Sequence, residues 1–120
     1  MPSLFDPIQL GAVAAPNRVL MAALTRGRNT REHVPTAMMA DYYRQRASAG
    51  LIISEATGIS RQGLGWPYAP GLWTDEQTEA WKPVVAQVHA APASFGGAAM
   101  NLLNRGSSNF SAEAPSGMVT

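Results

Sequence analysis

The sequence has 120 residues, with nine Lys and Arg against eight Asp and Glu, which gives a formal net charge of +1. This length is enough for one small domain with one core. The near-neutral charge offers no electrostatic footprint for nucleic acid or an anionic membrane, and the absence of cysteine excludes disulfides and Cys-based metal sites.

The amino-terminal residues have no basic region and no long apolar run, which argues against a signal peptide. No apolar stretch approaches the roughly 20 residues that cross a bilayer. We therefore expect a cytoplasmic protein with no nucleic-acid or membrane partner.

The first predicted elements are short extended segments. Ile8–Leu10 alternates apolar and polar residues before Gly11, and Ala15–Arg18 has the composition of a turn. Val19–Leu24 is a continuous apolar run, which predicts a strand buried on both faces. A short buried helix has the same pattern and stays open as an alternative.

A polar loop over Thr25–Pro35 separates this strand from a predicted helix. Thr36 is a candidate N-cap for a helix over Ala37–Ala49, and Gly50 is a candidate stop. Residues at helical spacing predict its core-facing side: Met39, Tyr42, Tyr43, Arg46 and Ala47.

Leu51–Glu55 predicts a second buried strand, immediately after the helix. A strand–helix–strand order predicts that the two strands pair in parallel. The following segment, Ala56–Trp73, is a long loop rich in Gly, Pro and aromatic residues. Loops of this length in compact domains are usually functional.

The pattern Thr74–Gln77 is a capping box, which predicts a second helix that continues to about Ala90. Pro83 predicts either a kink in this helix or a new helix starting beside it. From Pro92 to Thr120 the sequence is built mostly of Ala, Gly, Ser and Asn, which predicts a weakly ordered tail. Within the tail, Met100–Asn104 could form one helical turn.

Several blocks of this sequence occur in the order found in the old yellow enzyme family. They are Phe5–Gly11, Asn17–Val19, Met21–Arg26, Tyr42–Thr57 and Ala69–Gly71. From Leu4 to about Ala90 the sequence therefore resembles the amino-terminal part of these enzymes, which are NAD(P)H-dependent, FMN-containing (β/α)8 barrels that include ene reductases.

The resemblance implies an α/β fold, namely the N-terminal part of a (β/α)8 TIM barrel. Ile8–Arg18 would form a hairpin across the bottom of the barrel, followed by the first two β-α units. We therefore expect residues 1–90 to be a truncated part of an FMN-binding barrel, and residues 91–120 to be a low-complexity, disordered tail.

The resemblance also implies a cofactor-binding site. Thr25 takes the place at the end of the first strand where the family has a Thr or Cys beside the flavin, so that its hydroxyl could hydrogen-bond the flavin edge. Backbone groups of Ala23, Leu24 and Ala56 would pack along the flavin ring. Ala23 is a departure, because the family often has Pro there.

Two aromatic residues, Trp66 and Tyr68, lie in the long loop where the family places an aromatic over the substrate pocket. Packing within the loop is the alternative for both. The histidines His33 and His89 are acid–base candidates by chemistry alone, but the family assigns no chemistry to either position. The resemblance assigns no catalytic residue and no metal to this segment.

The implied function is FMN-dependent oxidoreduction of small activated alkenes by NAD(P)H. The family's third-strand Gln, its substrate-binding His/His or His/Asn pair, its Tyr proton donor and its phosphate-binding Arg are not found after Ala90, so we expect this chain by itself to be inactive. A non-enzymatic remnant or interaction module is the alternative. A nucleic-acid binder using Arg26, Arg28 and Arg31 is disfavoured by Glu32 and the low net charge.

Overall fold

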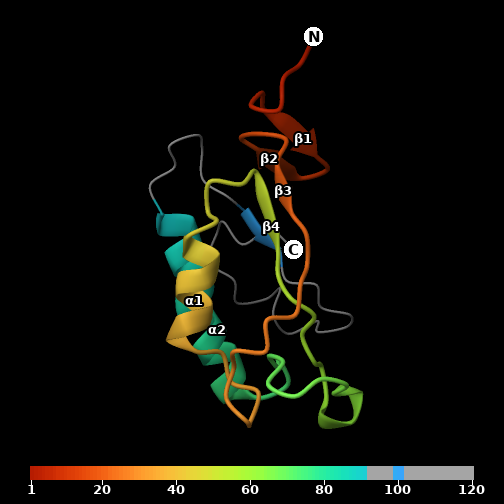
Figure 1. The fold of residues 1–120 in the computed structure, drawn as a ribbon, viewed down its shortest axis with the longest axis vertical. Coiled ribbons are helices and arrows are strands. Elements are labelled where there is room, and N and C mark those ends of the chain that lie inside the picture. Colours follow the sequence, from red (N-terminus) through yellow and green to blue (C-terminus); the bar gives the residue numbers. More distant parts are fainter. Residues whose placement is uncertain (92–98, 102–120) are drawn as a thin grey trace.

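The computed structural model describes residues 1–91 and 99–101. The chain begins with a hairpin of β1 (Ile8–Leu10) and β2 (Val13–Ala15), which pair antiparallel. Gly11 occupies the turn with a φ of +60°, a backbone conformation that glycine adopts without strain. The hairpin lies beyond one end of the main sheet (Figure 1), and its prediction is confirmed.

The main sheet consists of β3 (Leu20–Met21), β4 (Leu51–Ile53) and β5 (Ala99–Asn101), in that spatial order. Leu20 pairs with Leu51 and Ile53 pairs with Asn101, and both ladders are parallel. The predicted parallel pairing of the first two strands is therefore confirmed.

The strand β5 corrects the expectation of a helical turn at Met100–Asn104, which is wrong for residues 100 and 101. Pairing with β5 gives backbone partners to an edge of β4 that would otherwise be open. The remainder of the predicted tail lies outside the described residues.

The apolar run Val19–Leu24 is less structured than its composition predicts. Only its residues 20 and 21 form a strand, and Val19, Leu20 and Leu24 are 45%, 47% and 57% exposed. Burial on both faces is thus wrong for this part of the chain. Within the described residues β3 has a strand neighbour on one side only, so its other side stays uncovered.

The first helix, α1 (Ala37–Arg44), ends before the predicted Ala49. Thr36 occupies the N-cap position, but its side chain makes no capping hydrogen bond. Its hydroxyl instead donates to the Arg28 carbonyl oxygen at 2.7 Å, which ties the preceding loop to the start of the helix.

Gly50 does not end α1, because the helix already ends at Arg44. A Cβ at position 50 would lie 2.1 Å from the Asn17 carbonyl oxygen, so the close approach of two chain segments requires glycine. Buried Asn17 holds this junction: its side-chain amide donates to the Ser48 carbonyl at 2.9 Å, and its side-chain oxygen accepts from the Val19 amide at 3.0 Å.

The second helix, α2 (Asp75–Ala90), begins with the predicted capping box. The Gln77 amide donates to the Thr74 hydroxyl, and the Thr74 amide donates to the Gln77 side-chain oxygen, each at 3.1 Å. Pro83 lies on the exposed side of a single continuous helix. Of the two alternatives at this proline, a new helix beginning beside it is therefore wrong.

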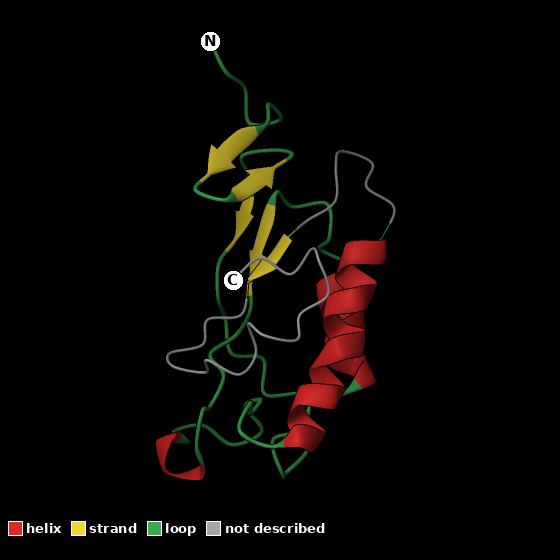
Figure 2. Ribbon diagram, turned by 180° about the vertical axis from the view of Figure 1, so that it is seen from behind, coloured by secondary structure: helices red, strands yellow, loops and turns green. Residues whose placement is uncertain are grey.

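Both helices cover the same side of the sheet (Figure 2). The core between these layers contains side chains that are at most 3% exposed: Met39, Ala40, Tyr43, Ile52, Trp81, Val84, Val85 and Val88. Within the described residues, no helix combines the length and the apolar composition needed to cross a membrane.

The predicted core-facing side of the first helix is correct in part. Met39, Tyr43 and Ala47 are buried, whereas Tyr42 is half-buried and Arg46 is exposed. The Arg46 guanidinium lies 3.8 Å from the centre of the Tyr42 ring. Its stem and charge thus cover the outer side of the core instead of entering it.

Candidate functional site

A hollow of about 310 Å³ lies where the chain leaves the carboxyl ends of β3 and β4. This is the end of a parallel sheet at which ligands and chemistry are usually found. The hollow, called the strand-end pocket below, has these lining residues: Thr25, Ala56, Thr57, Gly58, Gly63, Leu64, Gly65, Trp66 and Ala69.

The strand-end pocket brings together three residues that the sequence places far apart. Thr25 follows β3, Ala56 follows β4, and Trp66 comes from the long loop, where it is 64% exposed. The other predicted site residues, Ala23, Leu24 and Tyr68, are not among the lining residues. Leu24 and Tyr68 are both largely exposed.

Two threonine hydroxyls belong to this pocket, and they differ in their partners. The Thr57 hydroxyl donates to the Glu55 carbonyl oxygen at 3.0 Å. The Thr25 side chain is half-buried, and no hydrogen bond of its hydroxyl is found within residues 1–91. Thr25 therefore presents a hydroxyl that is available to a ligand in the pocket.

The long loop that closes one side of the pocket is held by its own backbone. The Gly58 amide donates to the Pro70 carbonyl at 2.9 Å, and the Leu72 amide donates to the Gly58 carbonyl at 2.8 Å. A short 3-10 helix, η1 (Arg61–Gly63), is capped by the Ser60 hydroxyl, which accepts from the Gly63 amide at 3.1 Å. The pocket thus has an ordered wall before any ligand arrives.

The most buried charged residue beside the pocket was given no role by the sequence interpretation. Glu55 is fully buried, and one carboxylate oxygen accepts from the backbone amides of Arg26 and Gly27 at 3.0 and 3.4 Å. Its other oxygen accepts from the Tyr43 hydroxyl at 3.2 Å. A carboxylate directly after a buried apolar strand was the signal that could have identified it.

Burial raises the pKa of the Tyr43 hydroxyl well above its ordinary value. Tyr43 therefore keeps its proton at neutral pH and donates a hydrogen bond to the Glu55 carboxylate. The hydroxyl oxygen in turn accepts from the Glu55 backbone amide at 2.8 Å.

His33 belongs to the packing of the loops. Its Nδ1 lies 2.7 Å from the Ala69 carbonyl oxygen, which accepts a hydrogen bond, and its own carbonyl accepts from the Gly71 amide at 2.8 Å. Its ring centre lies 5.9 Å from that of Trp73. These contacts join the loop after β3 to the loop after β4.

His89 lies near the end of α2 remote from the loops that form the strand-end pocket (Figure 1). Its Nε2 is buried without a hydrogen-bond partner within the described residues, and burial lowers its pKa below the ordinary value of 6.5. The unfolded chain therefore binds a proton more readily than the folded chain as the pH falls through 6.5.

We expect the thermal unfolding midpoint of the chain to be lower at pH 5.5 than at pH 7.5, with part of this decrease due to His89. Replacing His89 with Gln should reduce the fall, because Gln does not titrate in this range. Thermal unfolding at both pH values measures the effect, and Gln87→Ala, an exposed change on the same helix, is the control. An unchanged pH dependence in the His89→Gln chain would contradict the role of its burial.

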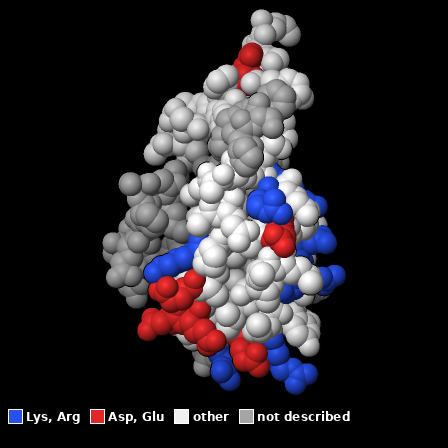
Figure 3. All heavy atoms as spheres, turned by 90° about the vertical axis from the view of Figure 1, so that its left-hand side faces the viewer, with Lys and Arg blue, Asp and Glu red and all other residues white. Residues whose placement is uncertain are grey.

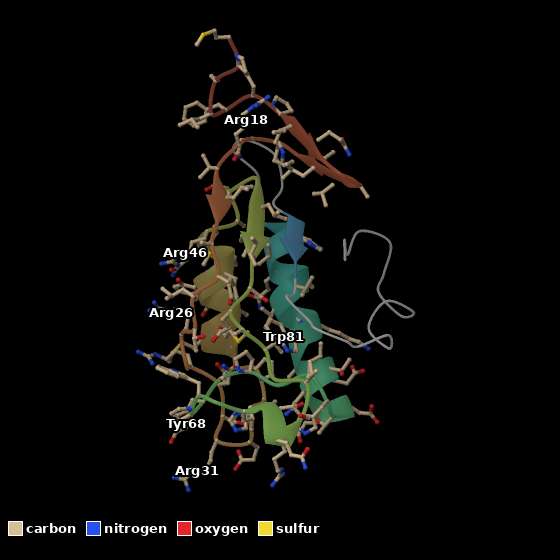
Figure 4. The ribbon with its side chains drawn as sticks, turned by 90° about the vertical axis from the view of Figure 1, so that its right-hand side faces the viewer. Arg18, Arg26, Arg31, Arg46, Tyr68 and Trp81 are labelled. Carbon is tan, nitrogen blue, oxygen red and sulfur yellow. The ribbon has the colours of Figure 1, made fainter. Side chains whose placement is uncertain are left out.

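Two arginine side chains are engaged with the aromatic ring of Tyr42. Arg26 and Arg46 lie side by side along α1 (Figure 4), with guanidinium carbons 4.8 and 3.8 Å from the Tyr42 ring centre. The helix-covered face carries both acidic and basic side chains (Figure 3). Within the described residues, no group of His, Asp and Glu is arranged to hold a metal ion.

The sequence model of the NADH:flavin oxidoreductase / NADH oxidase family matches residues 3–115. This match extends beyond Ala90, where the resemblance was expected to end. Among curated relatives, a putative 12-oxophytodienoate reductase 3 of Oryza sativa subsp. japonica is 48% identical over 93 residues, which are 77% of this chain and 24% of the relative. The chain thus spans about a quarter of that relative's length.

Solved structures agree with this relationship. The old yellow enzyme homologue from Zymomonas mobilis is 64% identical with a TM-score of 0.75, over 84% of this chain and 28% of that chain. Morphinone reductase in complex with tetrahydroNAD is 52% identical with the same TM-score of 0.75, over 85% of this chain and 27% of that chain. The predicted fold class, an N-terminal part of a (β/α)8 barrel, is confirmed by these likenesses.

Proposed function

This chain belongs to the NADH:flavin oxidoreductase / NADH oxidase family, and from that premise we propose that it supplies one wall of an FMN site in a barrel that reduces activated alkenes with NAD(P)H. The observation that carries this proposal is the strand-end pocket, which gathers Thr25, Ala56 and Trp66 at the carboxyl ends of neighbouring parallel strands.

The residues of the pocket fit one side of a flavin ring. Gly65, where a Cβ would meet no atom within 4 Å, and Ala56 leave room for a flat ring to approach the backbone, and Leu64 adds an apolar contact. The Thr25 hydroxyl offers a hydrogen bond at the edge of the ring. No lining residue among those described is cationic, so the phosphate of FMN would need groups from other strands of the barrel.

When bound, FMN would supply the chemistry of hydride transfer between NAD(P)H and an activated alkene. The role of this chain is to hold the flavin ring and to adjust its reduction potential. A hydrogen bond from Thr25 stabilises electron density on the reduced ring. Ala23 and Leu24 precede Thr25, and we propose that their backbone contributes to the same wall as Ala56.

We also propose that Trp66 and Tyr68 border the substrate pocket. Trp66 lines the strand-end pocket directly. Tyr68 lies nearby in the chain, with a φ of 58°, and its carbonyl accepts from the Asn29 side-chain amide at 2.8 Å. Small activated alkenes as substrates, and a cytoplasmic location, stay predictions.

Replacing Thr25 with Val should lower the flavin reduction potential and slow reduction by NAD(P)H. The test protein is a completed barrel, in which residues 4–91 of this chain replace the matching segment of the Zymomonas mobilis protein. Loss of one hydrogen bond of about 1 kcal/mol corresponds to roughly 20 mV for a two-electron couple. Spectroelectrochemical titration of the flavin measures the potential.

The matched control is Thr57→Val, because Thr57 lines the same pocket but donates its hydroxyl to the Glu55 carbonyl. The control should leave the potential close to that of the completed barrel. Equal potentials with and without the Thr25 hydroxyl would contradict its hydrogen bond to the flavin.

An interaction module without enzymatic activity is the second candidate function. The exposed apolar residues Leu20 in β3 and Val19 and Leu24 beside it favour this candidate, because an uncovered strand edge can pair with another chain. Absence of FMN binding by the completed barrel, together with self-association of the chain, would favour this candidate over the first.

A further inference from the structure

The loop that carries Thr25 is connected to the neighbouring strand by a side chain. The ladder between β3 and β4 pairs Leu20 with Leu51 and Met21 with Ile52, and it stops there. Four positions later, at Thr25, the chain lines the strand-end pocket. The contact that joins the two strand ends beyond the ladder is made by the Glu55 carboxylate, which accepts from the Arg26 and Gly27 amides.

We propose that Glu55 is the positioning residue of the strand-end pocket: its buried carboxylate fixes the backbone at Arg26 and Gly27, and thereby holds the Thr25 hydroxyl at the pocket wall. The first part of this inference stands on contacts within the chain. The second part, its consequence for a flavin, rests on the proposed function.

The planar peptide bond transmits this restraint to Thr25. The Arg26 amide and the Thr25 carbonyl belong to the same planar peptide unit. A hydrogen bond that fixes the amide therefore also fixes the orientation of the peptide plane between Thr25 and Arg26. The donor–acceptor distance of 3.0 Å is that of a well-formed hydrogen bond. The next amide, of Gly27, lies 3.4 Å from the same oxygen, with glycine at a φ of +61°.

Neutral donors hold the carboxylate itself. Glu55 is fully buried, and within the described residues it forms no salt bridge. Its other oxygen accepts from the Tyr43 hydroxyl, and that hydroxyl accepts from the Glu55 backbone amide. Because Tyr43 is fully buried in α1, the helix layer restrains the direction of the carboxylate.

A buried carboxylate of this kind is costly unless its hydrogen bonds are satisfied. Glu55 has donors at both oxygens, and these donors come from the loop after β3 and from α1. The arrangement thus links the core to the pocket, and removal of the carboxylate should loosen the Thr25 loop before it disturbs the core.

Amide hydrogen exchange of the full chain, measured by NMR, tests the first part. In the unmodified chain the Arg26 and Gly27 amides should be protected. In Glu55→Gln they should exchange about tenfold faster or more, since a single amide oxygen cannot accept from both the loop and Tyr43 and since bonds to charged acceptors are the stronger ones. The amides of Val84 and Val85 in the core should keep their rates.

Glu76→Gln is the matched control, because Glu76 is exposed on α2, and it should leave the Arg26 and Gly27 rates unchanged. Tyr43→Phe should produce a smaller acceleration at the same amides, because the carboxylate keeps its contacts with the loop. If Arg26 and Gly27 exchange as fast as exposed loop amides in the unmodified chain, the inference is overturned without any variant.

Flavin potentials of the completed barrel test the second part. Glu55→Gln is made with Thr25 present and in the Thr25→Val background, and the two changes in potential are compared. The lost negative charge acts in both backgrounds and cancels. We expect unequal changes, because Glu55 acts through Thr25; equal changes would overturn that link. If the completed barrel binds no FMN while the Arg26 and Gly27 amides of the chain are protected, the proposed function is contradicted and the role of Glu55 in the loop is supported.

Discussion

Replacing Trp81 with Ala should destabilise the chain by about 3–5 kcal/mol, which is a large part of the roughly 5–15 kcal/mol by which small domains are stable. Trp81 is fully buried on α2 and belongs to the core cluster (Figure 4). Its indole nitrogen donates to the Gly71 carbonyl oxygen at 3.0 Å. The truncation therefore leaves a cavity in the core and a carbonyl without its donor.

Equilibrium denaturation measures this change in the free energy of unfolding. Trp66→Ala is the matched control, because the Trp66 side chain is 64% exposed, and it should cost less than about 1 kcal/mol. Trp81→Phe keeps much of the apolar volume but removes the indole nitrogen, so its cost should fall between the two. A Trp81→Ala chain as stable as the Trp66→Ala chain would contradict the packing described here.

Elements with local causes were predicted well from the sequence. The capping box at Thr74–Gln77 needs only four consecutive residues, and it is present as predicted. The hairpin, which the resemblance placed over Ile8–Arg18, is present as β1 and β2 around the turn at Gly11. In each case the forces that define the element act between near neighbours in the chain.

Elements that depend on distant partners were predicted less well. β5 forms because β4 presents an edge, and the small residues around Met100 carry no strong strand signal of their own. The early end of α1 has a similar cause. The chain must turn towards the close approach of Gly50 to Asn17, and helical spacing does not reveal that approach.

In the candidate site, too, the contacts between segments distant in the sequence were the ones that sequence reasoning missed. The resemblance placed Thr25 and Ala56 beside the flavin and Trp66 over the substrate pocket, and the structure gathers these three residues around one hollow; their roles stay predictions. The contacts of Glu55 with Tyr43 and the Arg26 amide could not be derived, because they join the loop after one strand to the end of the next and to a helix.

The chain by itself should hold FMN at least about a hundredfold more weakly than the completed barrel. Its pocket supplies a hydroxyl and a ring-sized wall, but no cationic lining residue among those described to grip a phosphate. A hydrogen bond to a charged group contributes roughly 1.5–3 kcal/mol, so loss of the phosphate contacts alone accounts for about this factor. The uncovered side of β3 leaves the ring open to water as well.

We propose that this segment is one wall of a flavin site and needs the rest of the barrel to hold the cofactor. The decisive measurement is a titration of FMN into the chain alone and into the completed barrel, followed by flavin fluorescence and by NADPH consumption with a simple enone. We expect tight binding and enone-dependent NADPH consumption by the completed barrel, and neither by the chain alone. A chain that binds FMN as tightly as the completed barrel, or a completed barrel that binds none while the unmodified Zymomonas mobilis protein does, would contradict it.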